Sequence, residues 1–280
     1  MFSPAQSTTM LFDAELYNSL DKPWETILQF LGKTLPDLGF TSEEPEVVMD
    51  VGCGPGYLSK NYILPCFPNL QAMIALDAWP GMIEEAKTQH PHPRITYAVA
   101  DIEDRSTVQR WEGEITKLTA VHSFNWLKSQ RRGFETVHGL LKRGGEAAFY
   151  FPLDGPYYDG MIVTGSDPKF RPYFQNPDYC VPESYYNNYD SLHYQKMLMD
   201  IGFKIIHCKD EMKEDILSSD EEFRDVFYSV CPLVKHLPDH LKKDFKEQLF
   251  RNILKFNGRT EDGRPINRCK MVEILVRKEE

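Results

Sequence analysis

Short apolar runs alternate with segments of helical period between residues 45 and 151. Five runs predict buried strands, with the sequences EVVMDV, AMIALD, ITYAVA, ITKLTAVHS and EAAFYF. The segments between them predict helices at Tyr57–Leu64, Pro80–Thr88 and Ser129–Leu141, the last ending before the helix-stopping Gly144. Strands that alternate with helices are typical of βαβ units, whose right-handed crossovers build a parallel sheet. We therefore predict a doubly wound α/β fold with its ligand crevice at the carboxyl ends of the strands.

The pattern loosens after Phe151 into a segment rich in Pro, Gly, Asn and Tyr, which predicts a long loop or lid. Beyond it the periodicity predicts a helix at about Ser191–Asp200, a strand at about Phe203–Asp210, a helical insert at about Ser219–Phe256 and a final strand at about Lys270–Arg277. The two late strands would extend the same sheet. The pattern in residues 11–40 predicts one or two helices packed outside the sheet.

The charge balance and the cysteines narrow the range of partners. The formal net charge is −10, the pI is near 5.4, and the basic clusters are short, such as Lys142-Arg143 and Lys242-Lys243. Nucleic-acid binding usually needs an extended basic patch, so we expect no such partner. The six cysteines show no CxxC pair and no Cys/His ligand spacing, so we expect reduced thiols and no metal site. Without a basic leader or a run of about 18 apolar residues, we expect no membrane span and a cytoplasmic location.

A glycine-rich turn follows the first predicted strand, where Asp50 leads into Gly52, Gly54 and Gly56. The spacing is GxGxG, and Tyr57 stands where the dinucleotide fingerprint GxGxxG needs its third glycine. A P-loop does not fit either, because no Gly-Lys-Ser/Thr follows. Asp50 would repel an anion just before the turn, which further disfavours a ligand with a phosphate.

Two more carboxylates close the next predicted strands, Asp77 after AMIAL and Asp101 after ITYAVA. A carboxylate at the second strand end can accept both hydroxyls of a ribose, and one at the third can accept an exocyclic amine. S-adenosylmethionine offers these donors without a phosphate: a cationic amino-acid head near Asp50 and the turn, a ribose diol for Asp77 and an adenine amine for Asp101. The apolar residues that could sandwich the adenine ring are Trp79, Met82 and Ile102.

This order of motifs resembles the Rossmann-like class I methyltransferases, with DVGCGPG at Asp50–Gly56, LD within Ala75–Asp77 and AD at Ala100–Asp101. The resemblance implies a seven-stranded, mostly parallel, doubly wound sheet with N-terminal helices and a helical lid insert. It also implies S-adenosyl-L-methionine as the cofactor. The residues expected to bind it are Asp50, Gly52, Cys53, Gly54, Gly56, Asp77, Ala78, Trp79, Met82, Asp101, Ile102 and His122.

Length and composition favour one domain. The chain has 280 residues, 41% of them hydrophobic and 26% charged, which suits one large globular unit. We expect a single methyltransferase domain over residues 1–280. Its parts would be an N-terminal helical cap at 1–44, a cofactor-binding core at 45–151, and acceptor-side loops, the helical insert and the last two strands at 152–280.

The exit of the fourth predicted strand, LTAVHSFNWLKSQ at Leu118–Gln130, carries a narrower resemblance. Its Trp126 is similar to the tryptophan that trans-aconitate methyltransferases and juvenile hormone acid methyltransferases place here. The insert Phe223–Phe245 and the opening AELYN at Ala14–Asn18 also resemble the second family. That resemblance implies methyl transfer to the carboxylate of an isoprenoid or fatty acid. The residues expected to position this acceptor are Trp126, His122 and Trp24.

A carboxylate is ionised at neutral pH, so its methylation needs placement and exclusion of water rather than a general base. A hydrophobic acid also needs a dry, largely apolar pocket. The late segments offer many aromatic candidates for its walls, although aromatic residues in inserts often serve packing instead: Tyr157, Tyr158, Tyr173, Phe174, Tyr185, Tyr186, Phe227 and Tyr228.

One position departs from the juvenile hormone acid methyltransferases. Seven residues after the tyrosine that corresponds to Tyr17, they carry a glutamine thought to bind the acceptor carboxylate, and this chain has Trp24. An indole donates one hydrogen bond and has no amide fork. Two alternatives therefore stay open. One is a methyltransferase for another small molecule, such as a polar acid, a hydroxyl or an amine; the other is a catalytically weak paralogue that binds S-adenosylmethionine.

Overall fold

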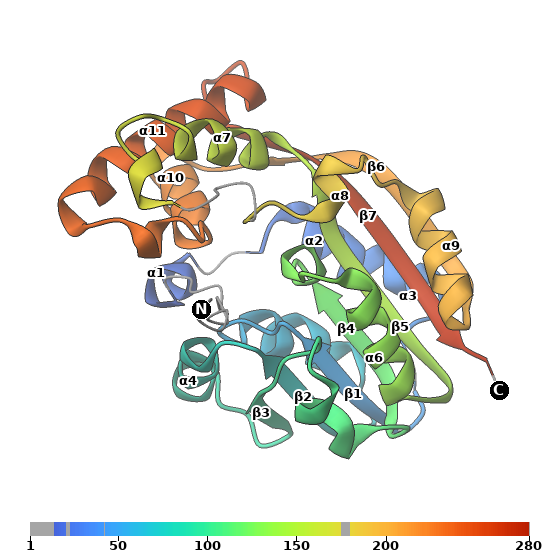
Figure 1. The fold of residues 1–280 in the computed structure, drawn as a ribbon. Helices are drawn as coiled ribbons and strands as arrows, with labels where there is room; N and C mark the ends of the chain where they lie inside the picture. The colour runs from blue at the N-terminus through green and yellow to red at the C-terminus, as the bar shows by residue number, and fades with distance from the viewer. Residues whose placement is uncertain (1–13, 21–22, 42, 175–179, 280) are drawn as a thin grey trace, which may run out of the picture.

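Seven strands form one mixed sheet in the computed structural model, which describes residues 14–20, 23–41, 43–174 and 180–279 (Figure 1). The strand order is β3-β2-β1-β4-β5-β7-β6, so successive crossovers change direction between β1 and β4. The first five strands are parallel, and β7 lies antiparallel between β5 and β6. The predicted mostly parallel, doubly wound sheet is confirmed. Its strands are β1 Glu46–Val51, β2 Leu70–Asp77, β3 Ile95–Val99, β4 Ile115–Val121, β5 Leu141–Asp154, β6 Phe203–Ile216 and β7 Ile266–Lys278.

Helices cover both faces of the sheet, because successive side chains of a buried strand point to opposite faces. Met49 and Val51 of β1 belong to one apolar core, and Val48, which precedes Met49, belongs to the other. The first core is closed by α5 Arg105–Val108, α6 Gln130–Leu140 and α9 Ser191–Ile201. The second is closed by α2 Glu25–Gln29, the segments that follow it (η1 Phe30–Thr34 and α3 Leu35–Asp37) and α4 Pro80–Gln89.

The helix predicted at Tyr57–Leu64 has a different geometry from the one expected. It winds as a π-helix over Ser59–Ile63 (η2) and tightens to a 3-10 turn over Leu64–Cys66 (η3). Pro65 has no N–H to continue an α-helical ladder, which is consistent with the change of geometry at Leu64. The predicted N-terminal helices are present as α1 Ala14–Ser19 and α2, while residues 1–13 and 21–22 of the expected cap lie outside the described part.

The segment predicted as a long loop or lid after Phe151 contains one full helix and two short ones in its described part, so it is not simply a loop. Helix α7 spans Pro156–Gly165, and the shorter η6 Arg171–Tyr173 and α8 Glu183–Tyr186 follow. Tertiary packing overrides the weak local signal here, because α7 lies on α11 Asp239–Asn257 at close range. At Gly160 a Cβ atom would stand 2.5 Å from Cγ1 of Ile253, so the glycine permits this approach.

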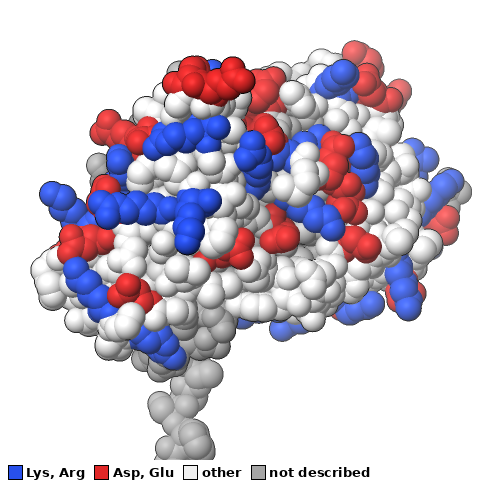
Figure 2. Space-filling model, turned by 90° about the horizontal axis from the view of Figure 1, so that it is seen from above, with Lys and Arg blue, Asp and Glu red and all other residues white. Residues whose placement is uncertain are grey.

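The helices of the predicted insert, together with α7, form a separate layer. Helices α7, α10 Asp220–Ser229 and α11 gather at one end of the sheet and share an apolar core (Figure 1). Figure 2 shows Lys and Arg lying among Asp and Glu over the face seen from above. Ion pairs of this layer include Arg224–Glu247 at 2.9 Å and Lys169–Asp244 at 2.5 Å. Among the described residues, no helix is both long and apolar enough to cross a membrane.

Strands β6 and β7 run several residues beyond their predicted ends. The extension of β6, from Glu211 to Ile216, is rich in charge and does not read as a buried strand. Cross-strand ion pairs support the two strands, with Lys213 3.0 Å from Glu273 and Lys270 3.1 Å from Asp210. The extension carries Asp215 and the start of α10 toward the carboxyl ends of the parallel strands.

Candidate functional site

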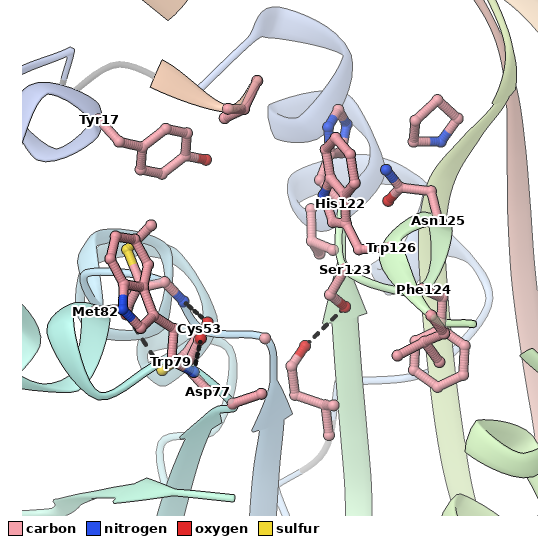
Figure 3. A pocket seen from close by; sticks show the side chains of 18 of the residues that line it. Tyr17, Cys53, Asp77, Trp79, Met82, His122, Ser123, Phe124, Asn125 and Trp126 are labelled. Carbon is pink, nitrogen blue, oxygen red and sulfur yellow. Dashed lines mark hydrogen bonds between the residues drawn. The ribbon is translucent and has the colours of Figure 1, made fainter. Parts of the chain in front are cut away.

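A cavity of about 680 Å³ opens at the carboxyl ends of the parallel strands, where the strand order reverses between β1 and β4. The fold places it at the predicted crevice. Figure 3 shows two sides. We call one the carboxylate side; it is made of Gly52, Cys53, Gly54, Asp77, Ala78, Trp79, Met82, Asp101 and Ile102. We call the other the aromatic side; it is made of Pro23, Trp24, Ile27, His122, Trp126, Tyr157, Tyr158, Val226, Phe227 and Val230.

The glycine turn has a backbone shape that other residues would not adopt. Gly52, Gly54 and Gly56 have φ angles of 74°, 53° and 87°. The Gly52 and Cys53 N–H groups both donate to the Leu76 carbonyl, at 2.7 and 2.8 Å. A Cβ at Gly52 would stand 2.2 Å from the Ser123 Cβ, and one at Gly56 would stand 2.8 Å from the Tyr97 hydroxyl. Gly56 therefore packs behind the turn and does not line the cavity.

Asp50 also lies behind the turn, although we expected it beside the ligand. It is 3% exposed, and its two oxygens accept from the Ser59 hydroxyl at 2.5 Å and the Thr119 hydroxyl at 3.1 Å. Burial raises the pKa of this carboxyl to about 6, against the lowering effect of those two hydrogen bonds. Its place among the interior contacts of β1, β4 and η2 makes it a structural residue that does not line the cavity.

Asp77 and Asp101 both line the cavity, as expected. The two oxygens of Asp77 accept the N–H groups of Trp79 at 2.9 Å and Gly54 at 3.0 Å (Figure 3). Burial raises the pKa of Asp77 above its usual value. Asp101 accepts the Glu103 N–H at 2.9 Å. A carboxylate oxygen can accept two hydrogen bonds, so both side chains keep acceptor capacity toward the cavity.

His122, at the exit of β4, has the unusual φ of 53° for a residue other than glycine. Its N–H donates to the Tyr150 carbonyl at 2.7 Å. The ring stands edge-on to Trp24, with centroids 5.4 Å apart, and Nε2 is inaccessible and unpartnered among the described residues. Burial lowers the pKa of His122 to about 4, so the imidazole is neutral at pH 7. The positive φ and the unpartnered polar atom make His122 a candidate functional position.

The buried Asn125 links His122 to Trp126. With its amide turned to suit both neighbours, it donates to the His122 carbonyl at 3.2 Å and accepts from the Trp126 indole N–H at 3.3 Å. The Trp126 ring stands edge-on to Tyr157, with centroids 6.5 Å apart. Trp126 therefore has a fixed orientation on the aromatic side. Asn125 was not among the expected residues, and only its place beside Trp126 in the sequence could have signalled it.

The aromatic side is uncharged. The cavity-lining cations among the described residues are Lys128 and Arg132; the Arg132 side chain donates to the Glu103 carbonyl, and the backbone N–H of Lys128 donates to the Glu103 carboxylate. Of the eight late aromatic candidates, Tyr157, Tyr158 and Phe227 line the cavity. The others do not; they pack in the insert or face solvent: Tyr173, Phe174, Tyr185, Tyr186 and Tyr228.

Some lining residues were not foreseen. Val226 and Val230 flank Phe227 on one face of α10, and this helical spacing was the available signal. Tyr17 of α1 also lines the cavity, and Figure 3 shows it across from Trp79 and Met82. Asn267 and Cys269 of β7 had no local signal. Within the ranges that the structure describes, no group of three or more His, Cys, Asp or Glu could hold a metal ion.

Comparison with known proteins identifies a methyltransferase domain in this chain. Residues 49–149 match the family described as a methyltransferase domain. The juvenile hormone acid O-methyltransferase of Drosophila melanogaster is 19% identical over 243 residues, which cover 85% of this chain and 82% of that protein. A malonyl-[acyl-carrier protein] O-methyltransferase of Anoxybacillus flavithermus is 32% identical over 102 residues, 36% of either chain.

A solved structure supports the same fold. The phosphoethanolamine N-methyltransferase 2 of Haemonchus contortus, in complex with phosphomonomethylethanolamine and S-adenosylhomocysteine, superposes with a TM-score of 0.55 at 13% identity. The match covers 95% of this chain and 57% of that one. The sheet order, the methyltransferase domain at residues 49–149 and these homologues identify the fold as that of the Rossmann-like methyltransferases and support an S-adenosylmethionine-dependent methyltransferase.

Proposed function

We propose that the carboxylate side of the cavity binds S-adenosyl-L-methionine. The open acceptor positions of Asp77 would receive the ribose hydroxyls, and those of Asp101 would receive the adenine amine. Trp79, Met82 and Ile102 would enclose the ring. At Gly54 the nearest atom to a Cβ would be 3.8 Å away, so the turn leaves room for a ligand. Residues 45–151 would then be the cofactor-binding core, and residues 1–44 and 152–280 would enclose the acceptor.

We further propose that the acceptor is the carboxylate of a hydrophobic acid, held on the aromatic side. The observation that carries this is the lining of that side: none of its residues, as defined above, is Lys, Arg, Asp or Glu, and the lining cations Lys128 and Arg132 adjoin Glu103 instead. Rings of Trp24, Phe227 and Tyr157 adjoin one another, with centroids 6.0 Å apart for the first pair and 5.2 Å for the second. Such a wall suits a hydrocarbon chain, each CH₂ of which contributes about 0.8 kcal/mol when buried.

An apolar setting also suits methyl transfer to a carboxylate. S-adenosyl-L-methionine, when bound, would supply a methyl group on a sulfonium for transfer to the carboxylate, leaving S-adenosylhomocysteine. A cation and an anion thus become a neutral thioether and a neutral ester, and a site that excludes water favours this loss of charge. The acceptor carboxylate carries no proton at neutral pH, so no residue of the site has to act as a general base. Trp24 would donate its indole N–H to the carboxylate, and Trp126, whose N–H already donates to Asn125, and the neutral His122 would orient it by contact.

A competition assay tests this proposal. Labelled methyl donor is offered with a panel of short polar acids, straight-chain fatty acids, farnesoic-type acids, alcohols and amines. We expect long apolar acids to be methylated fastest, with turnover rising with hydrocarbon length. Fastest methylation of a short polar acid, an alcohol or an amine would contradict the hydrophobic-acid proposal. Cofactor binding without turnover of any compound would instead support a binding paralogue.

A further inference from the structure

The aromatic side is closed by the start of α2, a helix that lacks a capping side chain of its own. Trp24 occupies the N-cap position with extended backbone (φ −62°, ψ 150°) and makes no side-chain capping bond. An indole has no acceptor to offer, and the first N–H groups of a helix have no partner within it. The start of α2 therefore needs an acceptor from elsewhere in the chain.

Asp215, near the end of β6, supplies that acceptor. Its Oδ1 accepts the Thr26 N–H at 3.0 Å and its Oδ2 accepts the Thr26 hydroxyl at 2.8 Å, across 189 residues of sequence. Thr26 is 5% exposed and Asp215 is 6% exposed. We call this pair the Asp215–Thr26 clamp. Hydrogen bonds to a buried carboxylate are strong, and loss of one partner leaves the other unsatisfied, so the clamp resists opening.

The clamp connects two walls of the cavity. Thr26 stands between the lining residues Trp24 and Ile27, and β6 leads from Asp215 directly toward α10, which carries Phe227. The rings of Trp24 and Phe227 lie 6.0 Å apart. Asp215 itself is not among the lining residues, so any effect on a bound molecule passes through the residues on either side of the clamp.

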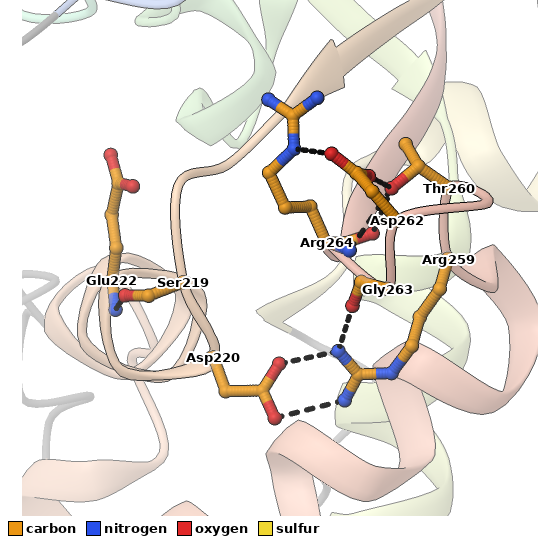
Figure 4. Close-up of polar contacts among 8 residues, drawn as sticks. All are labelled: Ser219, Asp220, Glu222, Arg259, Thr260, Asp262, Gly263 and Arg264. Carbon is orange, nitrogen blue, oxygen red and sulfur yellow. Dashed lines mark hydrogen bonds and ion pairs between the residues drawn. The ribbon is translucent and has the colours of Figure 1, made fainter.

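An exposed ion pair also holds the start of α10. Arg259 donates to both oxygens of Asp220, at 2.6 and 2.9 Å, and to the Gly263 carbonyl (Figure 4). The two charged side chains are 36% and 38% exposed. Exposed ion pairs contribute little to stability, so this pair is a suitable comparison for the buried clamp.

We propose that Asp215 is a positioning residue for the acceptor: by capping α2 it holds Trp24 against Phe227 and His122 and so sets the shape of the aromatic side. The inference rests on the proposed function only in taking the molecule on that side to be the acceptor. The placement of Trp24 by the clamp can be measured without any acceptor.

Fluorine NMR of protein labelled with 5-fluorotryptophan makes that measurement. The chain has four tryptophans, and Trp24→Phe assigns the resonance of interest. We expect Asp215→Ala to shift and broaden the Trp24 resonance while leaving that of Trp111 in place. The Michaelis constant for the acceptor should rise at least tenfold, and the Kd for S-adenosylhomocysteine should change less than threefold. Thr26→Ser should keep wild-type values, and Thr26→Val should lie between.

Two variants control for a general loss of stability. Glu146→Gln alters another buried carboxylate, which does not line the cavity and whose oxygen lies 2.6 Å from Nζ of Lys117. Arg259→Gln removes the exposed ion pair with Asp220. Both should leave the Trp24 resonance and the Michaelis constant unchanged. An unmoved Trp24 resonance in folded Asp215→Ala, or an equal rise of the Michaelis constant in Glu146→Gln, would overturn the proposal. If no compound in the panel is methylated, the resonance alone decides it.

Discussion

Replacing Asp77 with alanine tests the cofactor site most directly. In the free protein its two oxygens accept the Trp79 and Gly54 N–H groups, at 2.9 and 3.0 Å, and each keeps one acceptor position toward the cavity. Two ribose hydroxyls would fill those positions. Hydrogen bonds to a charged group contribute about 1.5–3 kcal/mol each, so losing both costs about 3 kcal/mol or more. That is roughly a 100-fold rise in Kd.

Isothermal titration with S-adenosylmethionine and S-adenosylhomocysteine measures the change. Asp77→Ala also removes acceptors for two backbone N–H groups, so some stability is lost. Asp190→Ala is the matched control, because Asp190 accepts the His193 N–H at 3.0 Å at the start of α9, outside the cavity. The control should lose a comparable amount of stability and keep its affinity. Equal affinity of wild type and folded Asp77→Ala would refute the assignment of this carboxylate to the ribose.

Three further predictions concern the aromatic side. Trp126→Ala should lower kcat/KM for a long acid at least tenfold while cofactor affinity stays within threefold, and equal losses of both would show a role in cofactor binding. Trp24→Gln should keep or raise turnover of long acids, since the amide NH₂ offers a carboxylate two N–H donors where the indole offers one; a loss of turnover with unchanged folding would contradict this. As the pH falls from about 6.5 to about 4, wild type should lose stability relative to His122→Gln. Burial lowers the pKa of His122 to about 4 in the folded protein, so the unfolded chain binds the proton more tightly and is favoured at low pH. The relative loss approaches about 3 kcal/mol; urea unfolding at several pH values measures it, and a pH-independent difference would argue against a buried neutral imidazole.

The carboxylates at the strand ends show what the sequence can and cannot predict. Asp50, Asp77 and Asp101 look alike in the sequence, since each follows an apolar run. Only the last two line the cavity. Asp50 accepts from Ser59 and Thr119, which are 9 and 69 residues away, and no local pattern announces those partners. The position of a carboxylate at a strand end is therefore predictable, but the direction of its side chain depends on which hydroxyls the fold brings to it.

The two sides of the cavity differ in how far local sequence determines them. The carboxylate side is built from turns directly after β1, β2 and β3, so strand prediction alone places most of its residues. The aromatic side gathers residues from the start of α2, the exit of β4, α7 and α10, and α7 itself was not predicted. Its shape depends on long-range contacts such as the Asp215–Thr26 clamp. On the proposal that the acceptor lies on the aromatic side, substitutions there would change the acceptor while the glycine turn and the strand-end carboxylates keep their motifs, so an assay identifies the acceptor and similarity of the domain does not.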